Sequence, residues 1–191
     1  FKMEKRVLDR RLAQMEAEGV VFRPGVNVGV DLSAEDLKAQ FDAVLLAGGA
    51  TIPRNLDVPG RELNGVHFAM DFLTLQNRQC EGDAVDQVIS AEGKHVVILG
   101  GGDTGADCLG TSHRQHAASV TSLEIMPQPP EGDNPDTPWP QWPRIMRSSS
   151  SHKEGCHRRW CVRTKQLSGR RGIAVKELHA CEVEWTTDAA G

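Results

Sequence analysis

Residues 95–105 read HVVILGGGDTG, and this stretch decides the fold. The five residues 95–99 form a compact, mostly apolar run, which predicts a strand. Gly100, Gly102 and Gly105 then come in the spacing G-x-G-x-x-G. On its own this spacing is weak evidence, because many glycine turns match it. Its value depends on the elements that stand before and after it.

Those elements are present on both sides of the glycines. Residues 104–115 have the pattern of a helix, and residues 119–126, SVTSLEIM, predict the next strand. Strand, glycine turn, helix and strand form the context in which this spacing binds dinucleotides. We therefore predict an α/β fold with a Rossmann-like NAD(P)-binding domain.

Each glycine has a separate physical role in such a turn. Gly100 lets the chain turn sharply, Gly102 lets backbone N–H groups approach a pyrophosphate, and Gly105 allows close contact between helix and strand. The N-terminus of the helix then offers unpaired N–H donors and a partial positive charge to the anion. Gly101 and Thr104 complete the predicted site. The alternative is a glycine turn with a purely structural role.

Asp103 lies inside the turn, where a carboxylate would repel a pyrophosphate, so we expect it to cap the helix. Glu124 lies near the end of the second predicted strand, 24 positions after Gly100. An acidic residue at that point binds the ribose 2′-OH of NAD, whereas an arginine accommodates the 2′-phosphate of NADP. Arg144 and Arg147, in the basic last part of the chain, are candidates for that phosphate. The sequence therefore leaves the nucleotide as NAD(P).

Upstream of this unit the chain contains further predicted elements. Gly19 closes a predicted helix, and Ser33 with Asp36 resembles a capping box. Asp42–Ala47 is an apolar run that ends in Gly48-Gly49, which is typical of a buried parallel strand. The elements expected before residue 50 are helices at 2–18 and 34–41, short extended pieces at 20–22 and 26–30, and the strand at 42–47.

Downstream of residue 50 the punctuation by proline and glycine predicts a connector at 51–66, a plausible domain crossing. Later, residues with strand-like alternation flank Ser168–Gly172, which predicts an antiparallel hairpin. The remaining expected elements are helices at 67–77 and around 85–91, an irregular proline-rich loop at 127–143, and hairpin strands at 158–167 and 173–185.

Composition excludes several classes of protein. The chain has 191 residues, 39% of them hydrophobic and 25% charged, which is ordinary for a folded domain. No apolar run is long enough for a membrane helix, and no secretory signal is evident. Five cysteines without a C-x-x-C pair argue against disulfides and zinc and favour a reduced, cytoplasmic protein.

Charge is uneven along the chain. Residues 61–140 carry a net charge of −8 and residues 141–191 a net charge of +5. The basic end is either a surface for phosphates or an acidic partner, or an ordinary solvated face. An acidic whole argues against a dedicated nucleic-acid binder.

Other candidate sites have simpler explanations. Without a G-x-S-x-G elbow, Ser148–Ser151 is expected to be a polar loop. His113 and His116 are expected to interact with a helix C-terminus rather than with a metal. Cys108 is expected in the core. Trp139 and Trp142 either stack on a ring or pack at a domain seam, and we favour packing.

Several stretches together resemble the small (beta) subunit of glutamate synthase, an NAD(P)H-oxidising flavoprotein. They cover most of the chain in the family's order: FKMEKRVLDRRLAQMEAEGVVF, FDAVLLAGGATIPRNLDVPGRELNGVHFAMDFL, HVVILGGGDTGADCLGTSHRQ, LEIMPQPP, NPDTPWPQWPRIMRSSSSHKEGC and VRTKQLSG. The resemblance implies the two-dinucleotide-domain plan of glutathione reductase. Residues 1–62 would be a partial FAD-binding segment, and residues 63–191 the NAD(P)H-binding domain.

The resemblance also implies a role. Hydride would pass from NAD(P)H to FAD, and electrons would leave through 4Fe-4S clusters to the large (alpha) subunit, which forms glutamate from glutamine and 2-oxoglutarate. The chemistry belongs to the cofactors, and the protein positions them. No side chain of this segment is a convincing acid or base, so we assign no catalytic residue.

Three features depart from the family pattern. The first FAD fingerprint, the iron–sulfur cysteines and the closing flavin contact are absent from this sequence, which suggests an internal fragment. The family's A-T-G-A segment, expected beside FAD, is present as Ala47-Gly48-Gly49-Ala50. Glycine at position 48 loses a hydroxyl and adds backbone freedom. We therefore predict that this chain alone neither holds FAD tightly nor completes the reaction.

Two other functions stay open. One is a related FAD- and NAD(P)H-dependent oxidoreductase that serves another partner, such as a pyrimidine or sulfide oxidoreductase. The other is a nucleotide-binding or interaction domain without activity of its own.

Overall fold

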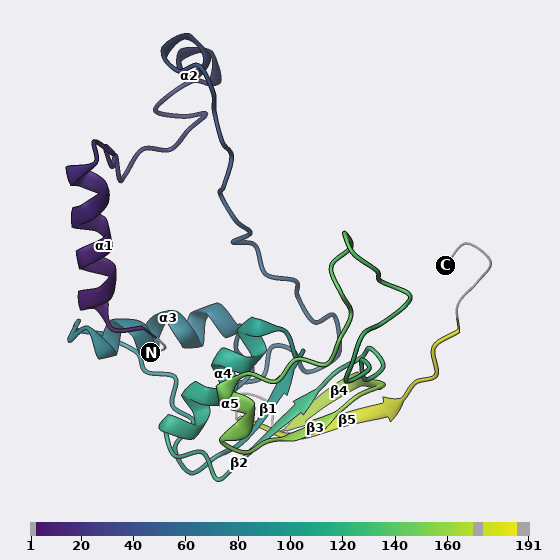
Figure 1. Ribbon diagram of the computed structural model, residues 1–191. Coiled ribbons are helices and arrows are strands. Elements are labelled where there is room, and N and C mark those ends of the chain that lie inside the picture. Colours follow the sequence, from purple (N-terminus) through teal and green to yellow (C-terminus); the bar gives the residue numbers. More distant parts are fainter. Residues whose placement is uncertain (1–2, 170–173, 187–191) are drawn as a thin grey trace. The chain divides into compact units, whose positions relative to one another are not determined.

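The computed structural model describes residues 3–169 and 174–186 and contains two compact units. Unit 1 is Phe1–Arg54 and unit 2 is Asn55–Gly191 (Figure 1). The break precedes Asn55, whereas the predicted domain boundary lies after residue 62. The connector lies with unit 2 because the Pro59 carbonyl accepts a hydrogen bond from the Leu167 N–H at 2.9 Å. The assignment of one cofactor to each domain stays a prediction.

Unit 1 contains the two predicted helices, α1 at Lys5–Ala17 and α2 at Ala34–Gln40. The predicted capping of α2 is confirmed, because Ser33 Oγ accepts a hydrogen bond from the Asp36 N–H at 3.0 Å. This contact satisfies one of the N–H groups that the first turn of a helix leaves without a partner. Helix start signals of this kind are local, and the sequence therefore reveals them.

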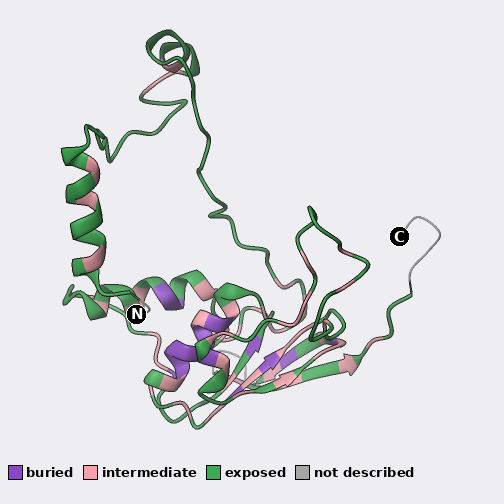
Figure 2. Cartoon of the chain, in the orientation of Figure 1, coloured by how far each residue is buried: buried purple, intermediate pink, exposed green. Residues whose placement is uncertain are grey.

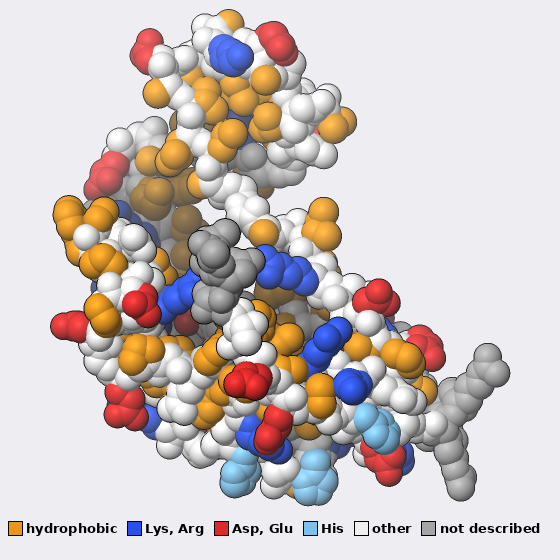
Figure 3. All heavy atoms as spheres, turned by 90° about the vertical axis from the view of Figure 1, so that its right-hand side faces the viewer, with side chains coloured by type: hydrophobic (Ala, Val, Ile, Leu, Met, Phe, Trp, Pro, Cys, Tyr) orange, Lys and Arg blue, Asp and Glu red, His pale blue; other side chains and the backbone are white. Residues whose placement is uncertain are grey.

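The predicted strand of unit 1 at 42–47 is wrong, because the described part of unit 1 contains no strand. The short pieces at 20–22 and 26–30 are neither helix nor strand. Leu45 is 90% exposed and Leu46 is 87% exposed. Figure 3 shows hydrophobic side chains at the surface in the upper part of the view, where α2 is drawn. A buried parallel strand needs neighbouring strands and covering layers, and the described residues of unit 1 provide neither.

Unit 2 is built on a parallel sheet of three strands in the order β1-β2-β3. The strands are β1 at His95–Leu99, β2 at Ser119–Leu123 and β3 at His157–Arg159. Val96 lies opposite Val120, and Leu123 lies opposite Arg159. β1 and β2 are confirmed, although β2 ends before residue 126. β3 was expected within the hairpin, and a three-residue strand has too little pattern to reveal its partner.

Helix α4, at Asp103–Arg114, connects β1 to β2 and packs against both of them. It carries six buried residues, more than any other described helix or strand (Figure 2), and Leu109 is only 1% exposed. Two further helices, α3 at Ala69–Cys80 and α5 at Ser150–Lys153, pack against α4. This parallel strand–helix–strand arrangement is the predicted Rossmann-like unit.

Two predictions around these helices are wrong. Residues 85–91 form no helix. Their polar residues and the neighbouring Gly82 leave too weak an apolar stripe for a helix. Ser148–Ser151 is only partly a loop, because Ser150 begins α5 and Ser151 is 1% exposed. A capping box between Ser149 and His152 stabilises that single turn.

The predicted antiparallel hairpin is confirmed as β4 at Val162–Gly169 and β5 at Val175–Glu182. Part of its turn, residues 170–173, lies outside the described residues. Beyond β5, the Trp185 indole N–H donates a hydrogen bond to the Ile125 carbonyl at 2.7 Å, which ties the hairpin to the chain that leaves β2. The irregular loop at 127–143 is also confirmed. Among the described residues, no helix has both the length and the apolar character needed to cross a membrane.

Candidate functional site

The glycine turn lies at the carboxyl end of β1, at the edge of a parallel sheet where such folds bind ligands. Gly100 has φ +106°, a conformation that side chains rarely adopt, so a glycine is required there. Its N–H donates to the Leu123 carbonyl at 2.9 Å and joins the turn to the end of β2. The sharp bend expected at Gly100 is therefore present.

Gly105 allows the close contact that the spacing predicts. A Cβ at Gly105 would lie 2.4 Å from the Gly100 carbonyl oxygen and 3.6 Å from Ile98. The first distance is too short for any side chain. The absence of a side chain at Gly105 thus lets α4 start directly against the turn and β1.

Gly102 differs from both, because a Cβ there would meet nothing within 4 Å. Gly102 is the N-cap residue of α4 and has no side chain to accept from the first-turn N–H groups. Gly102, Asp103 and Thr104 are all exposed. An anion can therefore approach the backbone N–H groups at this point, and a pyrophosphate fits the cradle.

The capping role predicted for Asp103 is wrong. Asp103 is the first residue inside α4, one position after the N-cap. A carboxylate in the first turn still interacts favourably with the positive end of the helix. Glycine also serves as an N-cap, so Gly102 takes this position. The helix α4 therefore begins at Asp103, one residue before the predicted start at residue 104.

Glu124 lies against the turn. A Cβ at Gly101 would be 1.8 Å from Glu124 Oε1, so the missing side chain of Gly101 makes room for this carboxylate. Sequence reasoning named both residues but missed their contact, because the spacing of 23 positions gives no sign of it. The structure thus brings Gly101 and Glu124 together at the carboxyl ends of β1 and β2.

Partial burial raises the pKa of the Glu124 carboxyl, and the positive charge of Arg158 opposes that rise. Arg158 belongs to β3, next to β2 in the sheet. Sequence reasoning did not single it out. Its position beside Glu124 results from the pairing of β3 with β2, which the sequence does not reveal.

Arg144 and Arg147 lie just after the proline-rich loop, and both are exposed. The Arg147 guanidinium lies over the Trp142 ring, with 4.1 Å between Cζ and the ring centroid. Trp139 is 91% exposed, and Trp142 is exposed too. Packing of these tryptophans at a domain seam stays a prediction.

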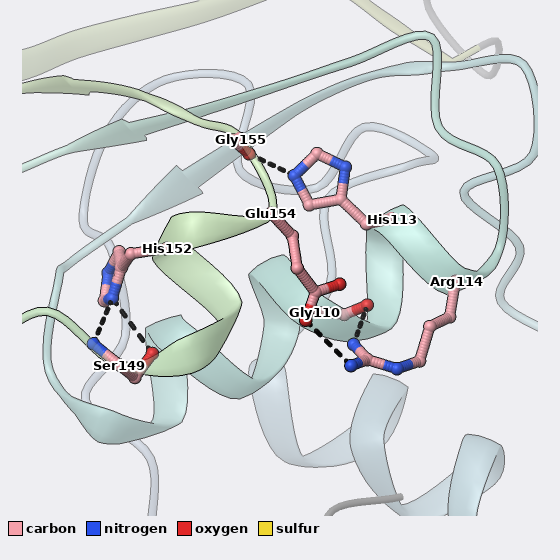
Figure 4. Close-up of polar contacts among 7 residues, drawn as sticks. All are labelled: Gly110, His113, Arg114, Ser149, His152, Glu154 and Gly155. Atoms are coloured by element: carbon pink, nitrogen blue, oxygen red, sulfur yellow. Dashed lines mark hydrogen bonds and ion pairs between the residues drawn. The ribbon is translucent and has the colours of Figure 1, made fainter.

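Polar contacts join α4 to α5 and to the residues that follow it (Figure 4). Arg114 donates from Nη2 to Glu154 Oε1 at 2.8 Å and from Nη1 to the Gly110 carbonyl at 2.7 Å. His113 contacts the Gly155 carbonyl through its Nε2 atom. Gly110 lies so close to Ser151 that a Cβ there would be 2.6 Å from the hydroxyl oxygen. These contacts fix α4 against the segment that precedes β3.

The segment expected beside FAD, Ala47-Gly48-Gly49-Ala50, belongs to unit 1 and is exposed throughout. A Cβ at Gly48 or Gly49 would meet nothing within 4 Å. Because no sheet or helix of unit 1 surrounds the segment, the described residues form no cradle for a flavin there. The residues present do not fit FAD by themselves.

Cys108 is buried, as expected of a core residue, and burial raises the pKa of its thiol to about 11. His113 contacts the Gly155 carbonyl, which follows α5. The described residues contain no group of three side chains that could hold a metal ion.

Comparison with known proteins identifies the family of the chain. The family model described as pyridine nucleotide-disulphide oxidoreductase matches residues 3–137. The chain is 58% identical to the glutamate synthase [NADPH] small chain of Mycobacterium tuberculosis (strain ATCC 25618 / H37Rv) over 96% of its length. It is 37% identical to the protein of that name from Bacillus subtilis, also over 96%, and 40% identical to the glutamate synthase [NADH] of Schizosaccharomyces pombe over all of it.

The chain spans 38% and 39% of the lengths of the Mycobacterium tuberculosis and Bacillus subtilis relatives, and 10% of that of the Schizosaccharomyces pombe relative. The resemblance to glutamate synthase small chains that the sequence motifs indicate is thus confirmed. The matched region includes both the glycine turn and the segment at residues 47–50. The chain belongs to the pyridine nucleotide-disulphide oxidoreductase family.

Proposed function

We propose that unit 2 is the NAD(P)H-binding domain of an electron-input flavoprotein, the small subunit of a glutamate synthase. The observation that carries this proposal is the open backbone at Gly102, directly between β1 and α4. A glycine turn with a structural role needs Gly100 and Gly105 but has no need for open space above Gly102. The similarity to glutamate synthase small chains supports the identity of the whole protein.

The residues of the turn have distinct tasks in this proposal. Backbone N–H groups at the start of α4 bind the pyrophosphate, and Gly102 leaves them accessible. Gly100 and Gly105 hold the turn in shape. Glu124 faces the ribose next to the pyrophosphate, and Arg144 and Arg147 are candidates for a 2′-phosphate. Binding in this orientation positions the nucleotide, and such positioning is the main contribution a protein makes to hydride transfer.

The nicotinamide supplies a hydride for FAD in the full-length protein. Electrons then reach 4Fe-4S clusters and the large subunit, where glutamine and 2-oxoglutarate give glutamate. We place this process in the cytoplasm, since the cysteine pattern favours reduced thiols. In this proposal the 191-residue chain contributes nucleotide binding. Other parts of the full-length protein bind the flavin and the clusters, and the large subunit is a separate partner.

Titration calorimetry of the 191-residue chain with NADH and NADPH tests the proposal. We expect at least one of the two nucleotides to bind at a single site. A Gly102→Val variant should lose at least about tenfold in affinity, because the side chain blocks the approach to the N–H groups, each charge-assisted hydrogen bond contributing about 1.5–3 kcal/mol.

Gly132→Val is the matched control. A Cβ at Gly132 also meets nothing within 4 Å, yet this glycine lies in the proline-rich loop and not in the turn. The control should bind like the wild type, and both variants should unfold at the wild-type temperature. A folded chain that binds neither nucleotide would contradict the proposal and favour a domain without nucleotide-dependent activity.

The same preparation tests the flavin. Because Ala47–Ala50 form no cradle, the purified chain should carry no stoichiometric FAD, and added FAD should bind weakly. A yellow protein with one flavin per chain, measured by absorbance after denaturation, would contradict this expectation.

A further inference from the structure

Arg158 is a cation near Glu124, the residue that we propose faces the ribose. It lies in β3, where it pairs with Ser122 of β2, two residues before Glu124. Glu124 is the first residue after β2, and its N–H donates to the carbonyl of Arg159, the residue after Arg158 in β3, at 2.8 Å. The backbone therefore brings Glu124 and Arg158 close together where these two strands end. Its charge acts on the Glu124 carboxyl, where it opposes the effect of burial.

The surroundings of Arg158 hold its guanidinium group in place. Nη1 donates to the Arg147 carbonyl at 3.3 Å, and Cζ lies 5.1 Å from the centroid of the Trp160 ring. Its Nε is buried and has no hydrogen-bond partner. A buried N–H donor without an acceptor is costly, so the group retains capacity for an acceptor that the described residues do not supply.

Two other arginines near Arg158 have other partners. Arg147 lies over Trp142, and Arg159, the next residue of β3, donates to Glu182 of β5 at 2.9 Å. Neither of them acts on the Glu124 carboxyl. Arg158 is therefore the arginine, among the described residues, whose charge is coupled to Glu124.

We propose that Arg158 determines whether the site accepts a nucleotide with a 2′-phosphate. This inference rests on the proposed binding of NAD(P)H at the glycine turn. The Glu124 carboxylate accepts a hydrogen bond from a free ribose 2′-OH but repels a phosphate. The Arg158 guanidinium offsets that repulsion and donates charge-assisted hydrogen bonds to the phosphate oxygens. Glu124 thus favours NADH, and Arg158 allows NADPH to bind at the same site.

Calorimetric titration of the 191-residue chain with NADH and with NADPH measures the affinity for each nucleotide. Arg158→Gln should weaken NADPH binding at least about tenfold, the effect of a lost hydrogen bond to a charged group, and leave NADH binding within about twofold. Arg159→Gln is the matched control from the same strand, and it should leave both affinities unchanged. Equal losses for both nucleotides in Arg158→Gln, or no loss for either, would overturn the inference.

Glu124→Gln tests the other half of the pair and does not depend on the folding of an Arg158 variant. Without the carboxylate, NADPH should bind several-fold more tightly and NADH more weakly. Unchanged preference in a folded Glu124→Gln protein would contradict the inference. If the wild-type chain binds neither nucleotide, the proposed function fails and this inference with it. If it binds both but Arg158→Gln affects them equally, only the inference fails.

Discussion

Residues 42–47 and residues 95–99 are two apolar runs that both lead into glycines, yet only the second is a strand. Asp42–Ala47 ends at Gly48-Gly49, and His95–Leu99 ends at three successive glycines. The first run is exposed and irregular, whereas the second forms β1 and pairs with β2 along its whole length. Apolar composition alone therefore does not produce a strand in this chain.

The two runs differ in the segments that come after them in the chain. After residues 95–99 the chain forms α4 and returns as β2, so that one continuous segment of 29 residues, 95–123, supplies both the neighbour strand and the covering helix. After residues 42–47 comes a connector that packs in unit 2. A parallel strand depends on partners distant in sequence, and unit 1 offers none among the described residues.

Hydrogen exchange should show the largest contrast between the two runs. β1 pairs only with β2, so the N–H groups of β1 that point to β2 are bonded within the sheet. Exchange of these amides should be slower than that of residues 43–47 by roughly 1000-fold or more, because it needs global unfolding. Mass spectrometry of peptic peptides measures both regions in one sample. Equal exchange in the two regions would mean that residues 42–47 pair as a strand in solution.

Truncation of one apolar side chain in each run should give the next largest difference. Ile98 is buried beneath α4, and Ile98→Ala should lower the free energy of unfolding by about 2–5 kcal/mol through lost burial and a cavity. Leu45→Ala, at a side chain that is already in solvent, should change it by less than about 0.5 kcal/mol. Urea unfolding monitored by circular dichroism compares them, and a large cost for Leu45→Ala would show hidden packing in unit 1.

Glycine replacements sharpen the same contrast. Gly105→Ala places a Cβ 2.4 Å from the Gly100 carbonyl oxygen, so α4 must shift, at a cost of about 1–3 kcal/mol. Gly48→Ala meets nothing within 4 Å and should be nearly neutral. Thermal unfolding of the two variants beside the wild type checks this. A neutral Gly105→Ala would argue that helix and turn are not in close contact.

The smallest expected effect concerns Cys108, the buried thiol of the helix that covers β1. Burial raises the pKa of Cys108 from 9.0 to about 11, because the folded state disfavours the thiolate. Between pH 9 and 11 the unfolded chain loses this proton first. The free energy of unfolding should therefore fall as pH rises through that window, by at most about 1.4 kcal/mol per pH unit.

A Cys108→Ala variant should lose this part of the pH dependence, whereas Cys80→Ala, at an exposed thiol, should keep it. Urea unfolding at several pH values between 9 and 11, the range between the ordinary pKa and the raised pKa of Cys108, provides the measurement. The same slope in wild type and Cys108→Ala would show that other groups titrate in its place.

Much of unit 2 and of its turn is predictable from sequence because the signals are local. The strand, the G-x-G-x-x-G turn and the helix succeed one another within residues 95–115, and the conformation of Gly100 and the close contact at Gly105 are those that the spacing suggests. The capping of α2 by Ser33 is equally local. The features that escaped prediction, β3 and the position of Arg158, depend on a strand of three residues that pairs across more than thirty positions.

The sequence by itself determined the position and shape of the glycine turn, because backbone freedom at Gly100 and the absence of side chains at Gly102 and Gly105 are properties of single residues. Only the tertiary structure decided which apolar run becomes a strand and which charges meet at Glu124. Both outcomes depend on contacts between residues far apart in the chain, and local propensity carries no information about such contacts.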